Sequence, residues 1–222
     1  MRNAVERAPS LVIFDCDGVL VDSERLIVDA EVQILAQMGV SIERNEIISH
    51  FVGTTGEDFR ARMKEVVGPG GYEQWRVAYQ NWFEREFYGA LEPIDGIEAT
   101  LCVIGGQRCV ASNSARERVM RSLRATGLDR HFGEHVFTAD DVDRGKPEPD
   151  LFLHAAAAMR VPPARCVVIE DSKFGVRAAR AAGMRALAYA GGITSADDLR
   201  GDDTTIFTDM SELPRLLRTV AT

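Results

Sequence analysis

Short apolar runs that alternate with helical patterns are the feature that most constrains how this chain can fold. Five such runs, rich in Val, Ile, Phe and Ala, occupy residues 11–14, 108–111, 135–138, 166–169 and 185–189. Helical patterns at residues 116–126, 149–159 and 174–182 separate the last four runs, and each ends near a glycine or proline. Strand and helix repeated in this order predict βαβ units. We therefore expect an α/β fold with a doubly wound, Rossmann-like parallel sheet and helices on both faces.

A long helical segment separates the first two predicted strands. Residues 22–92 show helical patterns throughout, with breaks at Gly39, Gly53 and residues 68–71. An aromatic stripe at helical spacing predicts a small apolar core here rather than a ligand-facing surface, and its members are Trp75, Tyr79, Trp82, Phe83 and Phe87. We expect an α/β core domain of residues 1–21 plus 93–222 and an inserted helical domain of residues 22–92. Because ligands of open parallel sheets bind beyond the carboxyl ends of the strands, an insertion that leaves the sheet there would cover such a site.

Composition and charge exclude several classes of protein. The chain of 222 residues carries a formal net charge of −8, which argues against a general nucleic-acid binder. Its apolar runs fall short of the roughly 18 residues that span a bilayer, and the opening stretch MRNAVERAPS lacks the apolar centre of a secretion signal. The four cysteines are expected to be buried free thiols, at Cys16, Cys102, Cys109 and Cys166. We expect a cytoplasmic protein that binds neither membranes nor nucleic acid.

Two acidic residues follow the first apolar run. Asp15 and Asp17 are two positions apart, so they point to the same side of an extended chain, and Gly18 permits a sharp turn directly after them. Two such close carboxylates raise each other's pKa unless a cation lies between them. The simpler alternative is an acidic strand end that faces water.

Three further polar stretches lie at predicted strand ends or loops. Ser112-Asn113-Ser114 is a candidate anion cradle or a helix cap. Glu170-Asp171-Ser172 follows a later run, and Lys146 lies in a loop whose prolines keep it out of a helix. Each stretch alone has an ordinary solvated or capping role. In a doubly wound sheet, however, they share one edge with Asp15 and Asp17, and so many acids would repel one another without a divalent cation. Oxygen ligands and a substrate phosphate favour Mg²⁺.

These stretches, taken together, resemble a known family. Residues 15–24 (DCDGVLVDSE), 111–114 (ASNS), 145–150 (GKPEPD) and 170–172 (EDS) are similar to the four ordered motifs of the haloacid dehalogenase-like superfamily. The likeness is to the phosphatase and phosphomutase branch that carries a helical cap after the first motif. Within that branch the sequence resembles sugar-phosphate and 6-phosphogluconate phosphatases. The resemblance spans nearly the whole chain.

The resemblance implies catalytic roles for five residues. Asp15 would be the nucleophile that forms an aspartyl-phosphate, and Asp17 the general acid that protonates the leaving alkoxide and then activates water. Ser112 and the backbone N–H of Asn113 would bind the phosphoryl oxygens, and Lys146 would neutralise charge between Asp15 and the phosphate. This division suits phosphoryl transfer, which relies on positioning, charge neutralisation and a covalent intermediate.

The resemblance also implies a magnesium site. Asp171 would bind Mg²⁺ together with the carboxylate of Asp15 and the backbone carbonyl of Asp17. Glu170 would act through a metal-bound water.

Two other reactions of the superfamily are weighed against hydrolysis of a phosphate ester. Halide leaves without a proton, so a dehalogenase has no use for Asp17. A β-phosphoglucomutase-type phosphomutase remains the closer alternative. That group has a histidine where Ile27 stands and a cap-loop arginine where Gly56 stands, and both departures favour hydrolysis.

Three further alternatives are considered. A phosphonoacetaldehyde hydrolase needs a Schiff-base lysine from the cap, where Lys64 is the one lysine and lies in a pattern typical of an exposed helix face. A cysteine phosphatase based on Cys16 would need an arginine where Asp22 stands. A catalytically inactive sugar-phosphate-binding protein stays open, although every motif acid and the lysine are present.

We therefore expect a Mg²⁺-dependent phosphatase that acts on a small phosphorylated metabolite, a sugar or sugar-acid phosphate, and is a monomer or weak dimer. The inserted cap would exclude water and select the leaving group. Candidate specificity residues are Thr54, Thr55, Glu57, Arg60 and Arg116.

Overall fold

The computed structural model describes residues 9–51, 56–68 and 70–219 of the chain. The chain divides into two compact units. The first, here called the core unit, comprises Met1–Asp22 and Glu92–Thr222, and the second, the helical unit, comprises Ser23–Leu91.

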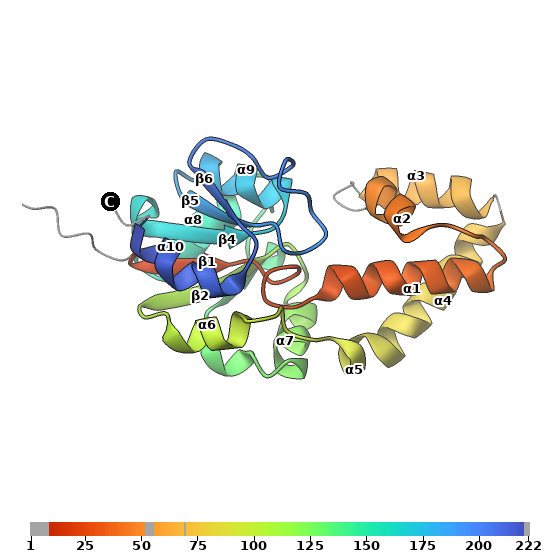
Figure 1. The fold of residues 1–222 in the computed structure, drawn as a ribbon, viewed down its shortest axis with the longest axis horizontal. Helices are drawn as coiled ribbons and strands as arrows, with labels where there is room; N and C mark the ends of the chain where they lie inside the picture. Colours follow the sequence, from red (N-terminus) through yellow and green to blue (C-terminus); the bar gives the residue numbers. More distant parts are fainter. Residues whose placement is uncertain (1–8, 52–55, 69, 220–222) are drawn as a thin grey trace, which may run out of the picture. The chain divides into compact units, whose positions relative to one another are not determined.

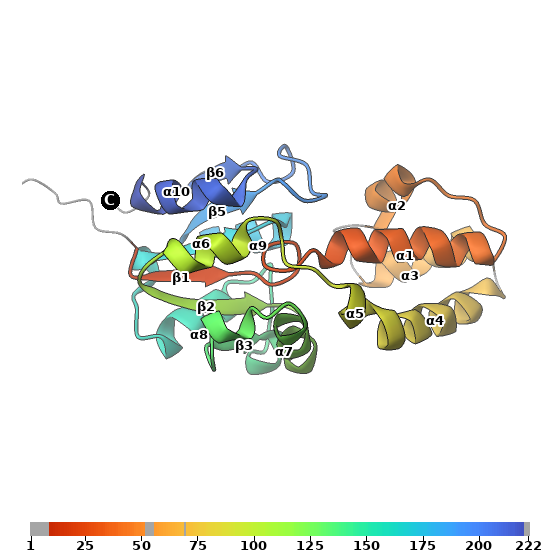
Figure 2. The same ribbon diagram turned by 60° about the horizontal axis from the view of Figure 1, so that its bottom comes forward.

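The core unit contains a six-stranded parallel sheet with the order β3-β2-β1-β4-β5-β6, whose strands are labelled in Figures 1 and 2 taken together. Its strands are β1 (Leu11–Phe14), β2 (Gln107–Ser112), β3 (Val136–Thr138), β4 (Cys166–Glu170), β5 (Arg185–Tyr189) and β6 (Thr204–Phe207). The predicted doubly wound parallel sheet is therefore confirmed. The sixth strand was not predicted, because β6 is short, half-exposed and carries two threonines at its start.

Helices pack against both faces of this sheet, as Figure 2 shows. They are α6 (Ile97–Val103), α7 (Arg116–Ala125), α8 (Asp150–Ala158), α9 (Lys173–Ala181) and α10 (Leu213–Thr219). The predicted helices at residues 116–126, 149–159 and 174–182 match α7, α8 and α9 to within one residue at each end.

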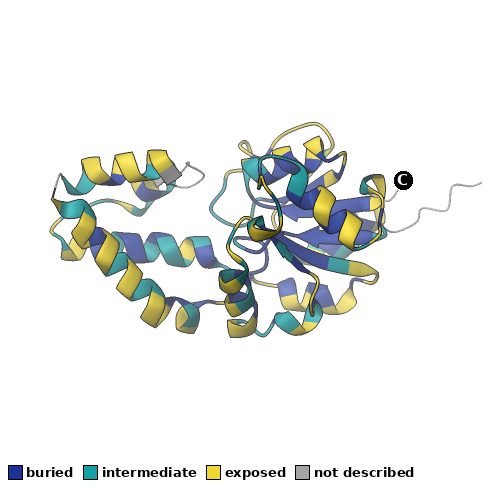
Figure 3. Ribbon diagram, turned by 180° about the vertical axis from the view of Figure 1, so that it is seen from behind, coloured by how far each residue is buried: buried dark blue, intermediate teal, exposed yellow. Residues whose placement is uncertain are grey.

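The central strands β1 and β4 are buried along their whole length because both faces of the sheet are covered there, and Figure 3 shows the middle of the sheet in the buried colour. Leu11 and Ile13 of β1 pack in a cluster with Leu151 and Phe152 of α8 and Val176 of α9. This double coverage explains why β1 is an unbroken apolar run and not an alternating one.

The register of β1 brings the carboxyl ends of three strands together. Phe14, the last residue of β1, pairs with Val110 of β2 and with Ile169 of β4. The residues that follow these three positions therefore emerge at one edge of the sheet.

The cysteines follow the prediction with one exception. All four are free thiols, and Cys16, Cys109 and Cys166 are buried. Cys102 is exposed, so its predicted burial is wrong. It lies on α6, a helix whose buried side chains are Ile97, Thr100 and Leu101.

The helical unit consists of α1 (Ser23–Gln37), α2 (Arg44–Phe51), α3 (Gly56–Val67), α4 (Gly71–Trp82), a π-helical segment Phe83–Phe87 and α5 (Tyr88–Ala90). The aromatic stripe packs within it. Trp75 and Phe87 are buried, and the ring of Trp75 stacks on that of Tyr79 with 5.5 Å between centroids. Among the described residues of both units, the helices are too short or too polar to cross a bilayer.

Candidate active site

Three adjacent strands deliver polar side chains to the same edge of the core sheet. Asp15 directly follows β1, Ser112 ends β2 and Glu170 ends β4. The backbone N–H of Asp15 donates to the carbonyl oxygen of Ile169 at 2.9 Å, which extends the pairing of β1 with β4 by one residue. Asp15, Ser112 and Glu170 are all buried.

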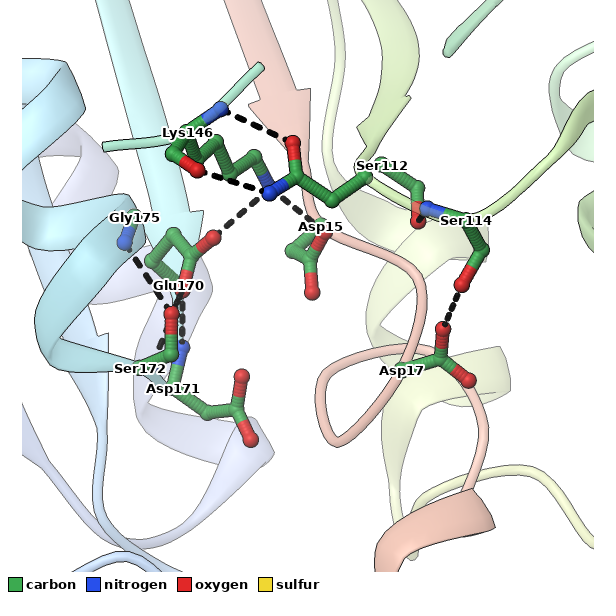
Figure 4. A network of polar contacts seen from close by, with 10 residues as sticks. Asp15, Asp17, Ser112, Ser114, Lys146, Glu170, Asp171, Ser172 and Gly175 are labelled. Atoms are coloured by element: carbon green, nitrogen blue, oxygen red, sulfur yellow. Dashed lines mark hydrogen bonds and ion pairs between the residues drawn. The ribbon is translucent and has the colours of Figure 1, made fainter. Parts of the chain in front are cut away.

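Lys146 joins this edge from the loop between β3 and α8. Its Nζ donates to Oδ1 of Asp15 at 2.6 Å and to Oε1 of Glu170 at 2.7 Å (Figure 4). The lysine side chain is only 4% exposed, and Nζ lies 4.9 Å from the centroid of the Phe152 ring. A buried cation is tolerated here because two carboxylates satisfy it.

Burial and charge act against each other on this pair. Burial raises the pKa of Asp15, Lys146 lowers it and the nearby Glu170 carboxylate raises it, and the net result is a pKa of about 7. Burial tends to lower the pKa of Lys146, but Asp15 and Glu170 outweigh it and raise that pKa above its usual value. The lysine therefore stays charged at neutral pH.

The turn from β4 into α9 fixes the carboxylate of Glu170. Its Oε2 accepts hydrogen bonds from the backbone N–H of Asp171 at 2.9 Å, from the N–H of Ser172 at 2.8 Å and from the Ser172 hydroxyl at 2.9 Å. A Cβ at Gly175 would lie 1.8 Å from this carboxylate, so a glycine is required where α9 approaches it. One oxygen of Glu170 is thus held by the turn while the other faces Lys146 (Figure 4).

Asp17 has different partners from Asp15. Its Oδ2 accepts a hydrogen bond from the Ser114 hydroxyl at 2.7 Å, and its Oδ1 lies 3.2 Å from a guanidinium nitrogen of Arg118. Neither contact was expected from the sequence. A signal was available, since Arg118 lies in the first turn of α7, directly after the Ser-Asn-Ser stretch.

The side chains of Ser112 and Asn113 organise the segment between β2 and α7. Ser112 Oγ accepts a hydrogen bond from the backbone N–H of Ser114 at 3.1 Å. The carboxamide of Asn113 bonds with the backbone of Lys146. The sequence suggested a phosphate-binding role for these two residues but not this connection to Lys146.

Three carboxylates form a group that fits a divalent cation. Single oxygens of Asp15, Glu170 and Asp171 all lie within 4.8 Å of one another, and the three residues are buried. A Cβ at Gly18, whose φ is +76°, would lie 1.9 Å from Oδ2 of Asp171, so glycine is needed where this loop meets Asp171. Because Lys146 alone cannot balance three carboxylates, these hard oxygen donors suit Mg²⁺.

The candidate specificity residues belong to two parts of the chain. Glu57 and Arg60 are exposed on α3 of the helical unit, and Thr54 and Thr55 lie outside the described residues. Arg116 begins α7, where its guanidinium donates to the carbonyl oxygen of Val136 at 2.9 Å and to Asp141 Oδ2 at 2.6 Å. Those bonds tie α7 to β3 and to the turn after it.

Comparison with known proteins identifies the family. The haloacid dehalogenase-like hydrolase family matches residues 9–183. The 6-phosphogluconate phosphatase of Escherichia coli is 30% identical over 92% of this chain and 93% of its own length. A phosphorylated carbohydrates phosphatase of Thermotoga maritima is 29% identical over 78% of this chain and 81% of its own length.

A solved structure agrees with these sequence matches. A hydrolase of this family from Deinococcus radiodurans, crystallised with bound phosphate and sodium, superimposes with a TM-score of 0.81 at 30% identity. The alignment covers 97% of this chain and 99% of that one. The chain belongs to the haloacid dehalogenase-like hydrolases. The expected family and enzyme class, a phosphatase of this superfamily, are confirmed.

Proposed function

We propose that this protein is a Mg²⁺-dependent phosphatase that hydrolyses a small sugar or sugar-acid phosphate through an aspartyl-phosphate on Asp15. The observation that carries the proposal is the buried Lys146, whose Nζ bridges Asp15 and Glu170 at 2.6 and 2.7 Å. The names of the two phosphatase relatives support phosphorylated carbohydrates as the substrate class.

Asp15 is the nucleophile in this proposal. One carboxylate oxygen attacks phosphorus while the bond from phosphorus to the alcohol oxygen breaks. Lys146 holds the other oxygen of Asp15 and provides positive charge beside the phosphoryl group. Ser112 and the backbone N–H of Asn113 bind the phosphoryl oxygens. Water then attacks the aspartyl-phosphate, which releases inorganic phosphate and restores Asp15.

Asp17 moves the proton in both steps. It protonates the departing alkoxide and then accepts a proton from the attacking water, so no net proton is left on it. The Ser114 hydroxyl and the Arg118 guanidinium hold its carboxylate in one orientation. Asp17 therefore has other partners than Asp15 and Glu170, which bind Lys146. Such an arrangement suits a group that exchanges a proton with the leaving oxygen and does not bind phosphorus.

A metal ion would be held by the acidic group at the same edge. Asp15 and Asp171 would bind Mg²⁺ with the backbone carbonyl of Asp17, and Glu170 would contribute through a water. When bound, the ion would supply positive charge beside the phosphoryl oxygens.

The helical unit has the role of a substrate-selecting cap in this proposal. Candidate contacts to the substrate are Thr54, Thr55, Glu57 and Arg60, with Arg116 from the core unit. The protein would act in the cytoplasm as a monomer or weak dimer.

A screen of phosphorylated metabolites for inorganic phosphate release tests the proposal. It should include 6-phosphogluconate and glucose 1-phosphate, with Asp15→Asn as the matched control because it keeps the shape of the side chain. We expect Mg²⁺-dependent release by the unaltered protein and background release by Asp15→Asn. Conversion of glucose 1-phosphate to glucose 6-phosphate without free phosphate would instead indicate a phosphomutase, and equal turnover by Asp15→Asn would contradict the proposal.

A further inference from the structure

The carboxamide of Asn113 pairs with the backbone of a residue far away in the sequence. Its Nδ2 donates to the carbonyl oxygen of Lys146 at 2.9 Å, and the backbone N–H of Lys146 donates to its Oδ1 at 2.8 Å. One side chain thereby satisfies both the donor and the acceptor of a single loop residue, as a neighbouring strand would.

This pairing fixes the backbone of Lys146, at the opposite end of the residue from Nζ. A lysine side chain has several rotatable bonds and loses much conformational entropy when it is fixed. Here the Nζ is held by Asp15 and Glu170, while the backbone of the same residue is held by Asn113. The loop position from which the side chain starts is therefore set by the segment that also carries Ser112.

Gly145 makes room for this arrangement. A Cβ built on it would lie 2.5 Å from Oδ1 and 3.2 Å from Cγ of Asn113. The next atom, Cβ of Ala139, is 3.6 Å away, which is an ordinary contact. The carboxamide of Asn113 is thus the obstacle that a side chain at position 145 would meet.

We propose that the Asn113 side chain is a positioning residue that sets the placement of Lys146 between Asp15 and Glu170. In this role it links the segment after β2, where Ser112 lies, to the loop that carries the charge-neutralising lysine. This is distinct from phosphate binding by the Asn113 backbone, which an alanine at this position would retain. The kinetic part of the inference rests on the proposed phosphatase function.

The kinetic test uses Asn113→Ala, Gly145→Ala and the double variant. A misplaced Lys146 weakens an interaction with the reacting groups, so we expect kcat to fall about 10²-fold in each single variant. KM should change much less than kcat. In the double variant the new Cβ meets no carboxamide, so its kcat should equal that of Asn113→Ala alone. Independent, multiplied losses in the double variant, or normal kcat in Asn113→Ala, would overturn the proposal.

A second test follows Lys146 without any turnover. The chain has three lysines, Lys64, Lys146 and Lys173, and only Lys146 is buried. Acetylation by acetic anhydride, read out by mass spectrometry, therefore has two exposed internal references. With two hydrogen bonds lost, Asn113→Ala should label at Lys146 about tenfold faster than the unaltered protein, with Lys64 and Lys173 unchanged.

Thr100→Val is the matched control for general loosening of the core unit. It removes another buried bond from a side chain to a distant backbone, from Thr100 Oγ1 to the carbonyl oxygen of Met210 at 2.9 Å. It should leave Lys146 labelling and kcat unchanged. Unchanged Lys146 labelling in Asn113→Ala, or equal acceleration in Thr100→Val, would overturn the positioning role. If the unaltered protein showed no Asp15-dependent turnover, the proposed function would fail while the labelling result still decided this inference.

Discussion

The core unit and the helical unit each bury a carboxyl group, but they surround it differently. In the core unit, the carboxylate of Asp15 lies beside the cation of Lys146, which also binds a second carboxylate, that of Glu170. In the helical unit, Glu31 of α1 is 3% exposed and accepts a hydrogen bond from the neutral indole of Trp75 at 2.7 Å. The pKa of each acid is raised to about 7, and burial is the largest cause in both.

Similar pKa values therefore arise from different balances. For Glu31, burial dominates and the Trp75 hydrogen bond opposes it weakly. For Asp15, burial is opposed by Lys146 and reinforced by Glu170. Burial of an acid alone does not make a catalytic site. What distinguishes the core unit is that several charges from different strands meet at one point, where they can be used on a substrate.

Removal of metal should have the largest effect on turnover, and it should change the core unit but not the helical unit. EDTA is expected to reduce phosphate release to background, and added Mg²⁺ should restore it, because three carboxylates would lose their counter-ion. Both tryptophans of the chain, Trp75 and Trp82, lie in the helical unit, so their fluorescence should stay constant. Full turnover in EDTA would remove Mg²⁺ from the account.

Loss of the buried cation should have the next largest effect. Lys146→Met leaves Asp15 and Glu170 buried without their partner, which raises the pKa of Asp15 further, and kcat should fall about 10³-fold. Lys146→Arg should retain more activity because it keeps the charge. Lys64→Met in the helical unit is the control and should behave normally. A loss with Lys64→Met as large as that with Lys146→Met would point instead to Schiff-base chemistry.

The buried acid of the helical unit should affect stability and not turnover. The pKa of Glu31 is about 7 in the folded state and 4.5 as an ordinary glutamate, so the folded state binds more protons between these values. Stability should therefore fall as pH rises through that window, by about 3 kcal/mol in total. Glu31→Gln keeps an acceptor for Trp75 and should remove this dependence. The free energy of unfolding is measured by urea unfolding at pH 5 and pH 8, followed by tryptophan fluorescence. An equal change in this free energy between the two pH values in the unaltered protein and in Glu31→Gln would contradict the prediction.

The smallest effects on turnover are expected from the two partners of the Asp17 carboxylate, the neutral Ser114 hydroxyl and the charged Arg118 guanidinium. Ser114→Ala should lower kcat about tenfold, because the acid loses a short hydrogen bond that orients it. Arg118→Met should cost less, because this pair is longer and its side chains are 32% and 23% exposed, so water screens it. Steady-state rates of the two variants decide the order, and a larger loss with Arg118→Met would reverse our assignment.

The strands and helices of the core sheet could be predicted because their apolar runs and helical patterns are regular. β6 was missed because it is a short, half-exposed strand with little apolar signal. The meeting of Asp15, Ser112 and Glu170 could be predicted from their places at strand ends. The place of Lys146 beside Asp15 was predicted only through the family resemblance, since a loop lysine is usually solvated. Its hydrogen bond to Glu170 was not predicted.

Other features depend on tertiary contacts that no local pattern carries. Asp15 and Asp17 were expected to act from one side of an extended chain. The contacts of Asp17 with Ser114 and Arg118 were not expected, and Gly18 turns the chain after it with a φ of +76°. The bond between Asn113 and Lys146 joins positions 33 residues apart, and only the folded loop brings them together.

Trapping the covalent intermediate tests the central claim, that Asp15 accepts the phosphoryl group, most directly. Asp17→Asn should slow release from the aspartyl-phosphate, so acid quenching during turnover of a ³²P-labelled substrate should leave label on the protein. Peptide mapping should locate that label at Asp15. Label on another residue, or label that persists in an Asp15→Asn, Asp17→Asn double variant, would contradict the account.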